Sequence, residues 1–248
     1  MSNLSEEIDE NALAFSKEWI SDLNKNAEAL KNNNNIKESY RRITALQALK
    51  VGIIQENYSK SAIDFFAEAQ NDALTSHVLA SFGAWRPALQ SLRSCIENVL
   101  NAHYYNDHPI ELRMWSNYEF RMGFSSLHTY FCKHPDVSPV GTDISGLNLL
   151  KEEYGTLSKA VHASAPIFRM TDPAAKLLLW NNDASKLGMW ATRERKVIEG
   201  VCLLTTILNQ PQLSGTAQTN VRAALGFALP NTRRIQLKKL HIHISDPI

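Results

Sequence analysis

The sequence predicts an all-α protein, an up-and-down helical bundle with peripheral helices at both ends. Apolar residues recur three and four positions apart over most of the chain, which is the spacing of an amphipathic helix. Glycine and proline number only 10 and 9 among 248 residues, so long helices are expected and a turn-rich β fold is disfavoured. No repeat or low-complexity linker divides the sequence, which predicts a single helical domain over residues 1–248.

Capping and turn signals predict the helices of the first half. Ser5 is suited to cap a helix that ends near Leu30, because its hydroxyl can accept a backbone amide proton. The asparagine run 32–35 favours a turn and ends this N-terminal helix, which lies within residues 1–35. Pro87 fits the first turn of a later helix. The helices expected after the asparagine run cover residues 38–57, 61–69, 73–82 and 85–107.

The second half of the chain shows the same helical spacing, interrupted by proline-marked loops at 133–144 and 166–173. The ending from Leu237 to Ile244 alternates apolar and polar residues as a short strand would, but no segment is evident to pair with it. The helices expected here cover residues 110–131, residues 143 or 145 to 161, residues 184–208 and residues 214–229.

Charge is nearly balanced overall but uneven along the chain. The formal net charge of +1 excludes a protein that binds nucleic acid through bulk charge. Residues 1–35 carry seven acids against three lysines, whereas the basic C-terminal tail, residues 222–248, carries five lysines and arginines against Asp246. Both ends are interpreted as solvated, or the tail as docking on a phosphate or an acidic partner.

The cysteines and apolar stretches predict the compartment. Cys95, Cys132 and Cys202 are widely spaced in apolar surroundings, so reduced, buried thiols are expected. The acidic N-terminus lacks the apolar core of a signal peptide. The longest apolar stretch, near residues 201–208, is shorter than the roughly 20 residues of a membrane span. A cytoplasmic location without membrane contact is therefore predicted.

Sequence motifs for common cofactors are absent. The chain contains no glycine-rich phosphate loop, no nucleophile elbow, no H-E-x-x-H and no Cys-x-x-Cys. His241 and His243 lie two apart, but without a third ligand they make a poor zinc site. Neither a metal nor a cofactor is predicted.

Two polar constellations form the candidate site. Arg93, Glu97 and Asn101 are spaced i, i+4, i+8, so they stack along one helix face beside an apolar stripe. His103 follows on the same side of that helix. The constellation is interpreted either as a partly buried structural ion pair or as a polar pocket that binds a phosphate or positions a nucleophile.

The second constellation is Tyr154, Ser158 and His162, with the same spacing, and Lys159 adds positive charge. A satisfied interior hydrogen-bond network is one interpretation. Serine-hydrolase chemistry is disfavoured, because adjacency on one helix is poor geometry and neither an orienting acid nor an oxyanion hole is indicated. If the two helices face each other, both constellations converge on one crevice, where helical bundles usually carry their sites.

These residues carry a resemblance to a known family. The segment ASFGAWRPALQSLRSCIENVL, residues 80–100, is similar to the central helix of HEPN-like bacterial proteins. It more closely resembles an uncharacterised HEPN-like group with the signature Ala-x-x-x-Leu-Arg-Ser-x-x-Glu. That group has a second block, Tyr-x-x-Leu-Ser-x-x-Val-His, which matches residues 154–162. The resemblance places a HEPN-like core at about residues 40–210.

Many HEPN proteins are ribonuclease toxins or subunits of antiviral systems, usually dimeric, and their nuclease signature is Arg-x-x-x-x-His. Arg93 and Ser94 fit its start, but Asn98 stands at the histidine position, and the signature occurs nowhere else in this sequence. Metal-independent RNA cleavage needs a general base, which asparagine cannot supply.

The resemblance therefore implies a non-catalytic HEPN-like subunit of a bacterial antiviral defence or toxin module. Such a subunit would form a homodimer or a hetero-complex with another protein of its system and would sense a nucleotide or RNA at the crevice. The alternative is a metal-independent HEPN-type ribonuclease toxin in which Arg93, His103 and His162 are catalytic. The binding residues expected in either case are Arg93, Glu97, Asn101, Tyr154, Ser158, Lys159 and His162.

Overall fold

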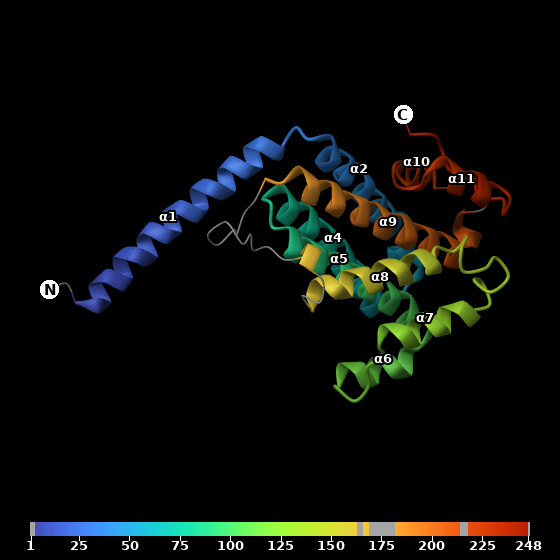
Figure 1. Ribbon diagram of the computed structural model, residues 1–248. Coiled ribbons are helices and arrows are strands. Elements are labelled where there is room, and N and C mark those ends of the chain that lie inside the picture. Colours follow the sequence, from blue (N-terminus) through green and yellow to red (C-terminus); the bar gives the residue numbers. More distant parts are fainter. Residues whose placement is uncertain (1–2, 163–165, 169–181, 214–217, 248) are drawn as a thin grey trace.

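The computed structural model describes residues 3–162, 166–168, 182–213 and 218–247. These residues form helices and turns without any β-strand, so the predicted all-α class is confirmed (Figure 1). The helices that pack together as the bundle are α2 (Asn34–Leu49), α4 (Lys60–Ser81), α5 (Trp85–Asp107), α8 (Leu147–Val161) and α9 (Ala184–Leu208).

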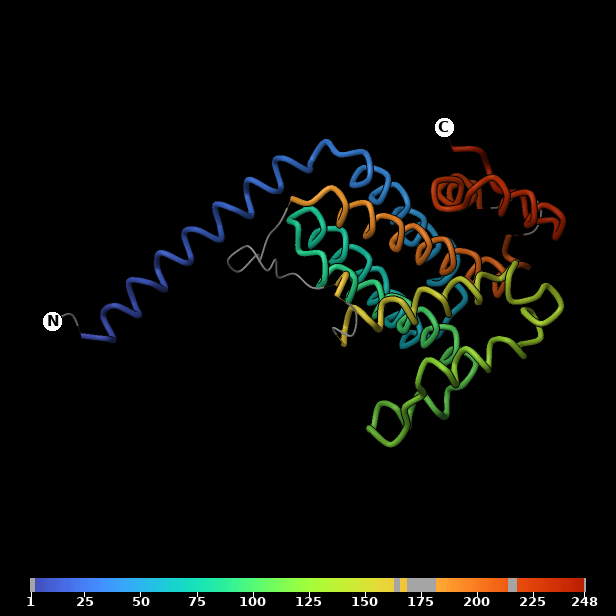
Figure 2. The backbone as a smooth tube through the Cα atoms, in the orientation of Figure 1, coloured from blue at the N-terminus to red at the C-terminus, as the bar shows by residue number. Residues whose placement is uncertain are grey.

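Peripheral elements lie at both ends of the bundle, as predicted. The helix α1 (Leu4–Leu30) extends away from the other helices, as the tube in Figure 2 shows. Beside α5, the helices α6 (Pro109–Ser116) and α7 (Phe124–Lys133) form a separate lobe. The short helix α10 (Thr219–Ala228) packs on α2 and α9, and α11 (Asn231–Lys238) follows it. Among the described helices, none has the length and apolar character that crossing a membrane requires.

The hairpin of α4 and α5 forms the centre of the bundle. At its turn Gly83 has φ +79°, a left-handed conformation that glycine adopts without a Cβ clash. The two helices predicted over residues 61–69 and 73–82 are one helix, which corrects the prediction. The polar residues 70–72 suggested a break, but Ala69 and Ala73 continue the same buried face across them. Small residues on that face let α5 approach closely.

Several predicted helix ends are shifted. Asn3, not Ser5, caps α1, because its side chain accepts from the Ser5 amide while Glu6 accepts from the Asn3 amide. The second helix starts at Asn34, and it continues through a π-helical segment, η1 (Lys50–Ile54), into α3 (Gln55–Asn57). This π-helical turn presents Gly52 to α10, where a Cβ would lie 2.6 Å from Val221 Cγ2. Close packing of α10 therefore accounts for the glycine.

The helix predicted over residues 110–131 is broken, which is the largest error in the predicted elements. The chain leaves α6 at Asn117, and Tyr118 takes a left-handed conformation with φ 64° before α7 begins at Phe124. Apolar spacing continues through the break because Phe120 and Met122 pack against the core from the loop. Periodicity alone could not separate a loop with packed side chains from a helix.

The helix α8 lies close to α9 because two glycines allow it. It starts at Leu147, after Gly146 with φ +79°, rather than at residue 143 or 145 as predicted. A Cβ on Gly146 would lie 2.8 Å from the Gly200 carbonyl oxygen, and one on Gly200 would lie 2.7 Å from Leu150 Cδ2. The buried carboxylate of Glu153 fixes the same contact through an ion pair with Arg193 of α9, at 2.8 Å.

The basic C-terminal tail is tied to the chain's own surface. Arg222 is buried and donates to backbone carbonyls of Leu213 and His243. Arg233 pairs with Glu199 at 3.0 Å, and Arg234 pairs with Asp246. The alternating segment 237–244 consists of the end of α11, a turn over residues 239–241 and irregular backbone, so the strand interpretation is wrong. The helix predicted over 214–229 covers Thr219–Ala228, and residues 214–217 lie outside the described residues.

Candidate functional site

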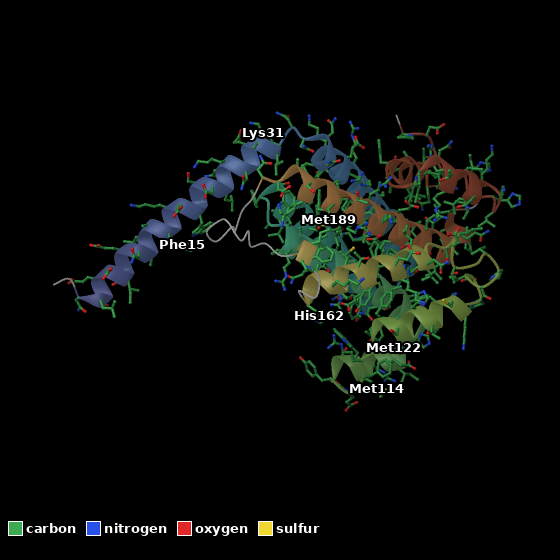
Figure 3. The ribbon with its side chains drawn as sticks, in the orientation of Figure 1. Phe15, Lys31, Met114, Met122, His162 and Met189 are labelled. Carbon is green, nitrogen blue, oxygen red and sulfur yellow. The ribbon has the colours of Figure 1, made fainter. Side chains whose placement is uncertain are left out.

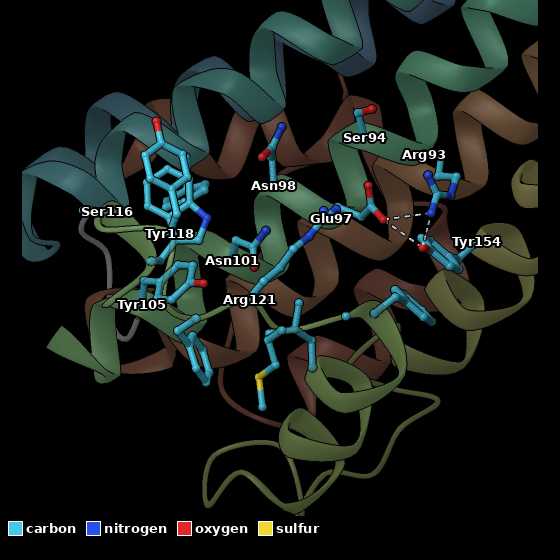
Figure 4. Close-up of a pocket in the computed structure, with 17 residues that line it drawn as sticks. Arg93, Ser94, Glu97, Asn98, Asn101, Tyr105, Ser116, Tyr118, Arg121 and Tyr154 are labelled. Atoms are coloured by element: carbon cyan, nitrogen blue, oxygen red, sulfur yellow. Dashed lines mark hydrogen bonds and ion pairs between the residues drawn. The ribbon is translucent and has the colours of Figure 1, made fainter. Parts of the chain in front are cut away.

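The crossing of α5 and α8 brings the two predicted constellations together. Arg93 Nη2 lies 3.0 Å from Glu97 Oε1, and Arg93 Nε donates to Ser158 Oγ at 3.3 Å. The Tyr154 hydroxyl accepts from Arg93 and donates to Glu97 at 2.8 Å, as the dashed lines in Figure 4 show. The predicted contact between the two blocks is therefore confirmed, and Arg93 and Glu97 lie within ion-pair reach.

Aromatic packing fixes this network from a third helix. Phe124, the first residue of α7, stacks on Tyr154 with ring centroids 3.7 Å apart and an interplanar angle of 4°. The Arg93 guanidinium carbon lies 4.7 Å from the Tyr154 ring centroid, within cation–π distance. Burial and the adjacent Glu97 carboxylate raise the pKa of the Tyr154 hydroxyl, so it remains a hydrogen-bond donor at neutral pH. Arg93 is thus held in place by α8, and α7 supports the Tyr154 ring that it contacts.

A cleft of about 820 Å³ opens beside the network, between α5 and the α6–α7 lobe. Its walls combine aromatic rings with two arginines and several amides and hydroxyls (Figure 4). The aromatic residues are Phe65, Tyr105, Trp115, Tyr118, Phe120, Phe124 and Tyr154. The polar residues are Arg93, Ser94, Glu97, Asn98, Asn101, Ser116 and Arg121. Concave sites that combine aromatic side chains with placed polar groups are where small ligands usually bind, and this cleft contains seven residues of each kind.

The cleft contains residues that sequence analysis missed. Arg121 belongs to the loop between α6 and α7, and Figure 4 shows it extending into the cleft beside the predicted residue Asn101. Tyr118, at the start of the same loop, is 98% exposed and lies on the rim. The sequence predicts a continuous helix over residues 110–131, and in such a helix Arg121 and Tyr118 would not lie beside α5. Recognition of a helix break at Asn117 would have placed both residues in a loop.

Asn98, which stands at the histidine position of the nuclease signature, is paired with a carboxyl group. Its side-chain amide donates to Asp72 Oδ2 of α4 at 2.8 Å. Burial, with the nearby charges of Glu68 and Glu97, raises the pKa of Asp72 to about 6. The cleft wall therefore holds an amide, backed by a weakly acidic carboxyl group on α4, at the position where the HEPN nuclease signature has a histidine.

His103 does not join the site, which corrects the expectation that it lies on the same side as Arg93. It is 2% exposed, with Nδ1 2.7 Å from the Tyr58 hydroxyl and Nε2 3.0 Å from Thr205 Oγ1. Burial lowers the pKa of His103 to about 3, so the ring is neutral. Ten residues of helix separate it from Arg93 by about 15 Å along the axis and by a large rotation. His103 is a satisfied core residue.

His162 and Lys159 lie outside the cleft lining. His162 is exposed and follows the last turn of α8, at the end of that helix seen in Figure 3. Lys159 is also exposed. Arg86 donates to the backbone carbonyls of Ala160 and Val161 in the last turn of α8, at 2.9 Å each. The structure therefore brings together Arg93, Glu97, Asn101, Tyr154 and Ser158, and it leaves Lys159 and His162 at the edge.

A second, smaller pocket of about 150 Å³ lies near the end of α5. It is lined by Tyr58 and His103 together with Asp107, His134 and Asp136. His134 Nε2 lies 3.3 Å from Asp107 Oδ2. Within the described ranges, no group of three histidines, cysteines or acids is arranged to hold a metal ion.

Comparisons with protein-family models, with curated proteins and with solved structures return no match to this chain. The HEPN-like resemblance consequently stays a prediction from the two sequence blocks, and the site has to be interpreted from its own geometry.

Proposed function

We propose that the protein is a non-catalytic, HEPN-like subunit of a bacterial antiviral defence or toxin module, and that its cleft binds a nucleotide or a short single-stranded RNA segment. The observation that carries the binding proposal is the cleft itself, in which a fixed guanidinium stands among aromatic rings. The assignment to a defence or toxin module rests on the resemblance of the two sequence blocks.

The lining chemistry matches the two parts of a nucleotide. Bases stack on aromatic side chains whatever their sequence, and phosphate oxygens accept charge-assisted hydrogen bonds from guanidinium groups. Arg93 uses Nε and Nη2 for Ser158, Tyr154 and Glu97, which leaves Nη1 for a phosphate oxygen. Arg121 supplies a second cation from the opposite wall, and Trp115 with Tyr118 supplies stacking surfaces.

The absence of a histidine from the described cleft lining supports a binding role over HEPN-type cleavage. No histidine is among the described residues that line the cleft. His103 is neutral and hydrogen-bonded in the core, and Asn98 is engaged by Asp72. Cleavage through a 2′-hydroxyl needs a group within hydrogen-bond reach to take its proton. The alternative, a ribonuclease that uses Arg93, His103 and His162, would need these side chains to meet.

Binding can be tested with a fluorescein-labelled single-stranded RNA and, separately, with ATP. Fluorescence anisotropy and calorimetry should show saturable binding to the full chain. The variants Arg121→Ala and Trp115→Ala should each weaken binding at least about fivefold, since one stacking or charge contact is worth about 1–3 kcal/mol. Arg113→Ala is the matched control, because Arg113 is an exposed arginine of α6 that does not line the cleft.

The same samples separate the candidate functions. If neither RNA nor ATP binds, or if Arg113→Ala weakens binding as much as Arg121→Ala, the cleft proposal is wrong. If the protein cuts RNA without added metal, and both Arg93→Ala and His162→Ala abolish the cut while still folding, the ribonuclease alternative replaces it.

A further inference from the structure

An apolar face runs along α1 and is uncovered over most of the helix in the described part of the protomer. The exposed fractions of its large side chains are 69% for Leu4, 56% for Ile8 and 51% for Phe15. The contact with the bundle is confined to the last turns, where Asn26 donates to the Phe82 carbonyl and Leu30 is buried. Figure 3 shows Phe15 on the projecting part of the helix.

A helix this long and this exposed is not stabilised by its own protomer. Isolated helices are marginal in water, and helices in proteins draw most of their stability from packing an apolar face. Contiguous exposed apolar surface on a folded protein marks a contact site. The face of α1 therefore needs a partner.

The spacing of this face describes the partner's shape. Its central stripe advances in steps of four, four and three residues and consists of Leu4, Ile8, Ala12, Phe15, Trp19 and Leu23. The pattern repeats after 11 residues, and an 11-residue repeat keeps an apolar stripe aligned with a neighbouring helix over many turns. A short groove on a globular partner would need only a few anchors at i, i+3 or i+4, and i+7. A long helix alongside α1 fits the pattern better.

The charges on α1 favour one orientation of such a helix. Glu6, Glu7, Asp9 and Glu10 lie in its first third with no lysine among them. From residue 17 to residue 31, three lysines balance three acids. A parallel pair of α1 helices would oppose the two acidic clusters, whereas an antiparallel pair opposes each cluster to the neutral half of its partner.

We propose that the partner is a second copy of this chain, bound through antiparallel pairing of α1 with α1 around a two-fold axis. The same chain supplies a helix with the matching repeat, and two-fold pairing satisfies both copies at once. The 27 residues of α1 span about 40 Å, which is long enough for an interface of ordinary dimer size. The proposal is independent of the cleft, since α1 does not line it.

Sedimentation of the full chain between about 1 and 100 µM tests the pairing, that range covering affinities typical of dimers. The wild type should be a dimer, and Phe15→Glu should weaken association at least tenfold. Ala14→Glu is the matched control, because it adds the same charge to an exposed position that is not part of the stripe, about 100° round the helix from Phe15, and it should dimerise as the wild type does. Circular dichroism should show the same fold for both variants. A monomeric wild type, or equal association of both variants, overturns the proposal.

A spin label tests the orientation. Cysteine is introduced at Ser5 in a Cys132→Ser background, since Cys95 and Cys202 are buried. Double electron–electron resonance should give a separation beyond about 20 Å for the antiparallel pair. A parallel pair would bring the labels to about 10 Å, the spacing of packed helices, and would refute the antiparallel arrangement.

Discussion

Two arginine–glutamate pairs in this molecule share the same chemistry but sit in opposite environments. Arg42 of α2 and Glu194 of α9 are 152 positions apart in sequence, and their side chains are 9% and 0% exposed. Arg93 and Glu97 lie one turn apart on α5, and their side chains are 24% and 28% exposed on the wall of the cleft. The first pair joins two helices of the bundle, whereas the second remains accessible to a ligand.

Burial decides what each pair does. Burying two charges costs free energy of hydration, and their mutual attraction offsets that cost only while both partners are present. Burial raises the pKa of Glu194 although Arg42 acts in the opposite direction, so desolvation is the larger effect there. Partly exposed charges retain part of their hydration, and Arg93 can exchange a water for a phosphate oxygen. A buried pair therefore holds the fold together, and an accessible pair can bind.

The largest expected effect comes from breaking the buried pair. Arg42→Ala should lower the free energy of unfolding by about 3–5 kcal/mol, because Glu194 stays in the core without its cation. Urea denaturation measures the loss. The neighbouring Arg41→Ala is the control, since its pair with Glu38 is about half exposed and should cost less than about 1 kcal/mol. Equal losses would show that burial does not distinguish the pairs.

The next effect concerns acid stability and His103. Its pKa of about 3 in the folded state lies below the ordinary value of 6.5, so the unfolded chain takes up a proton first as the pH falls. The free energy of unfolding should decrease from about pH 7 toward pH 3. His103→Gln should have a flatter pH dependence over this interval, whatever its stability at pH 7. A slope identical to that of the wild type would contradict a neutral, buried imidazole.

Breaking the accessible pair should have a smaller effect on stability. Arg93→Ala should cost about 1 kcal/mol, because the Tyr154 hydroxyl still donates to Glu97 and water reaches the cleft. Thermal and urea unfolding, compared with Arg42→Ala, check the ranking. A loss as large as that of Arg42→Ala would make Arg93 a structural residue and would weaken the binding proposal.

A further effect concerns Asp72 and the pH dependence of stability. Its folded-state pKa of about 6 exceeds the ordinary 3.8, so between these values the folded protein holds more protons than the unfolded chain. This carboxyl group should therefore reduce stability as the pH rises from about 4 to about 6. Asp72→Asn should remove that decrease and leave the fold unchanged, as measured by unfolding at pH 4, 5, 6 and 7. An unchanged slope would contradict the raised pKa.

The sequence by itself determined the all-α class and most of the long helices. The helices from Trp85 to Asp107 and from Ala184 to Leu208 were predicted with the ends that the structure has. Each of them carries an uninterrupted apolar stripe and a distinct stop, and these are local signals. Spacing along one helix also predicted the pairing of Arg93 with Glu97, since i and i+4 are neighbours on any helix.

Only the tertiary structure decided the rest of the site. The reach of Tyr154 and Ser158 to Arg93 depends on how α5 crosses α8, and Arg121 enters the cleft only because the chain breaks after α6. The same is true of the Arg42–Glu194 pair, whose members are far apart in sequence. Helical periodicity indicates which face of a helix is apolar, but it does not indicate which other helix packs against that face. That choice depends on side-chain packing over the whole bundle.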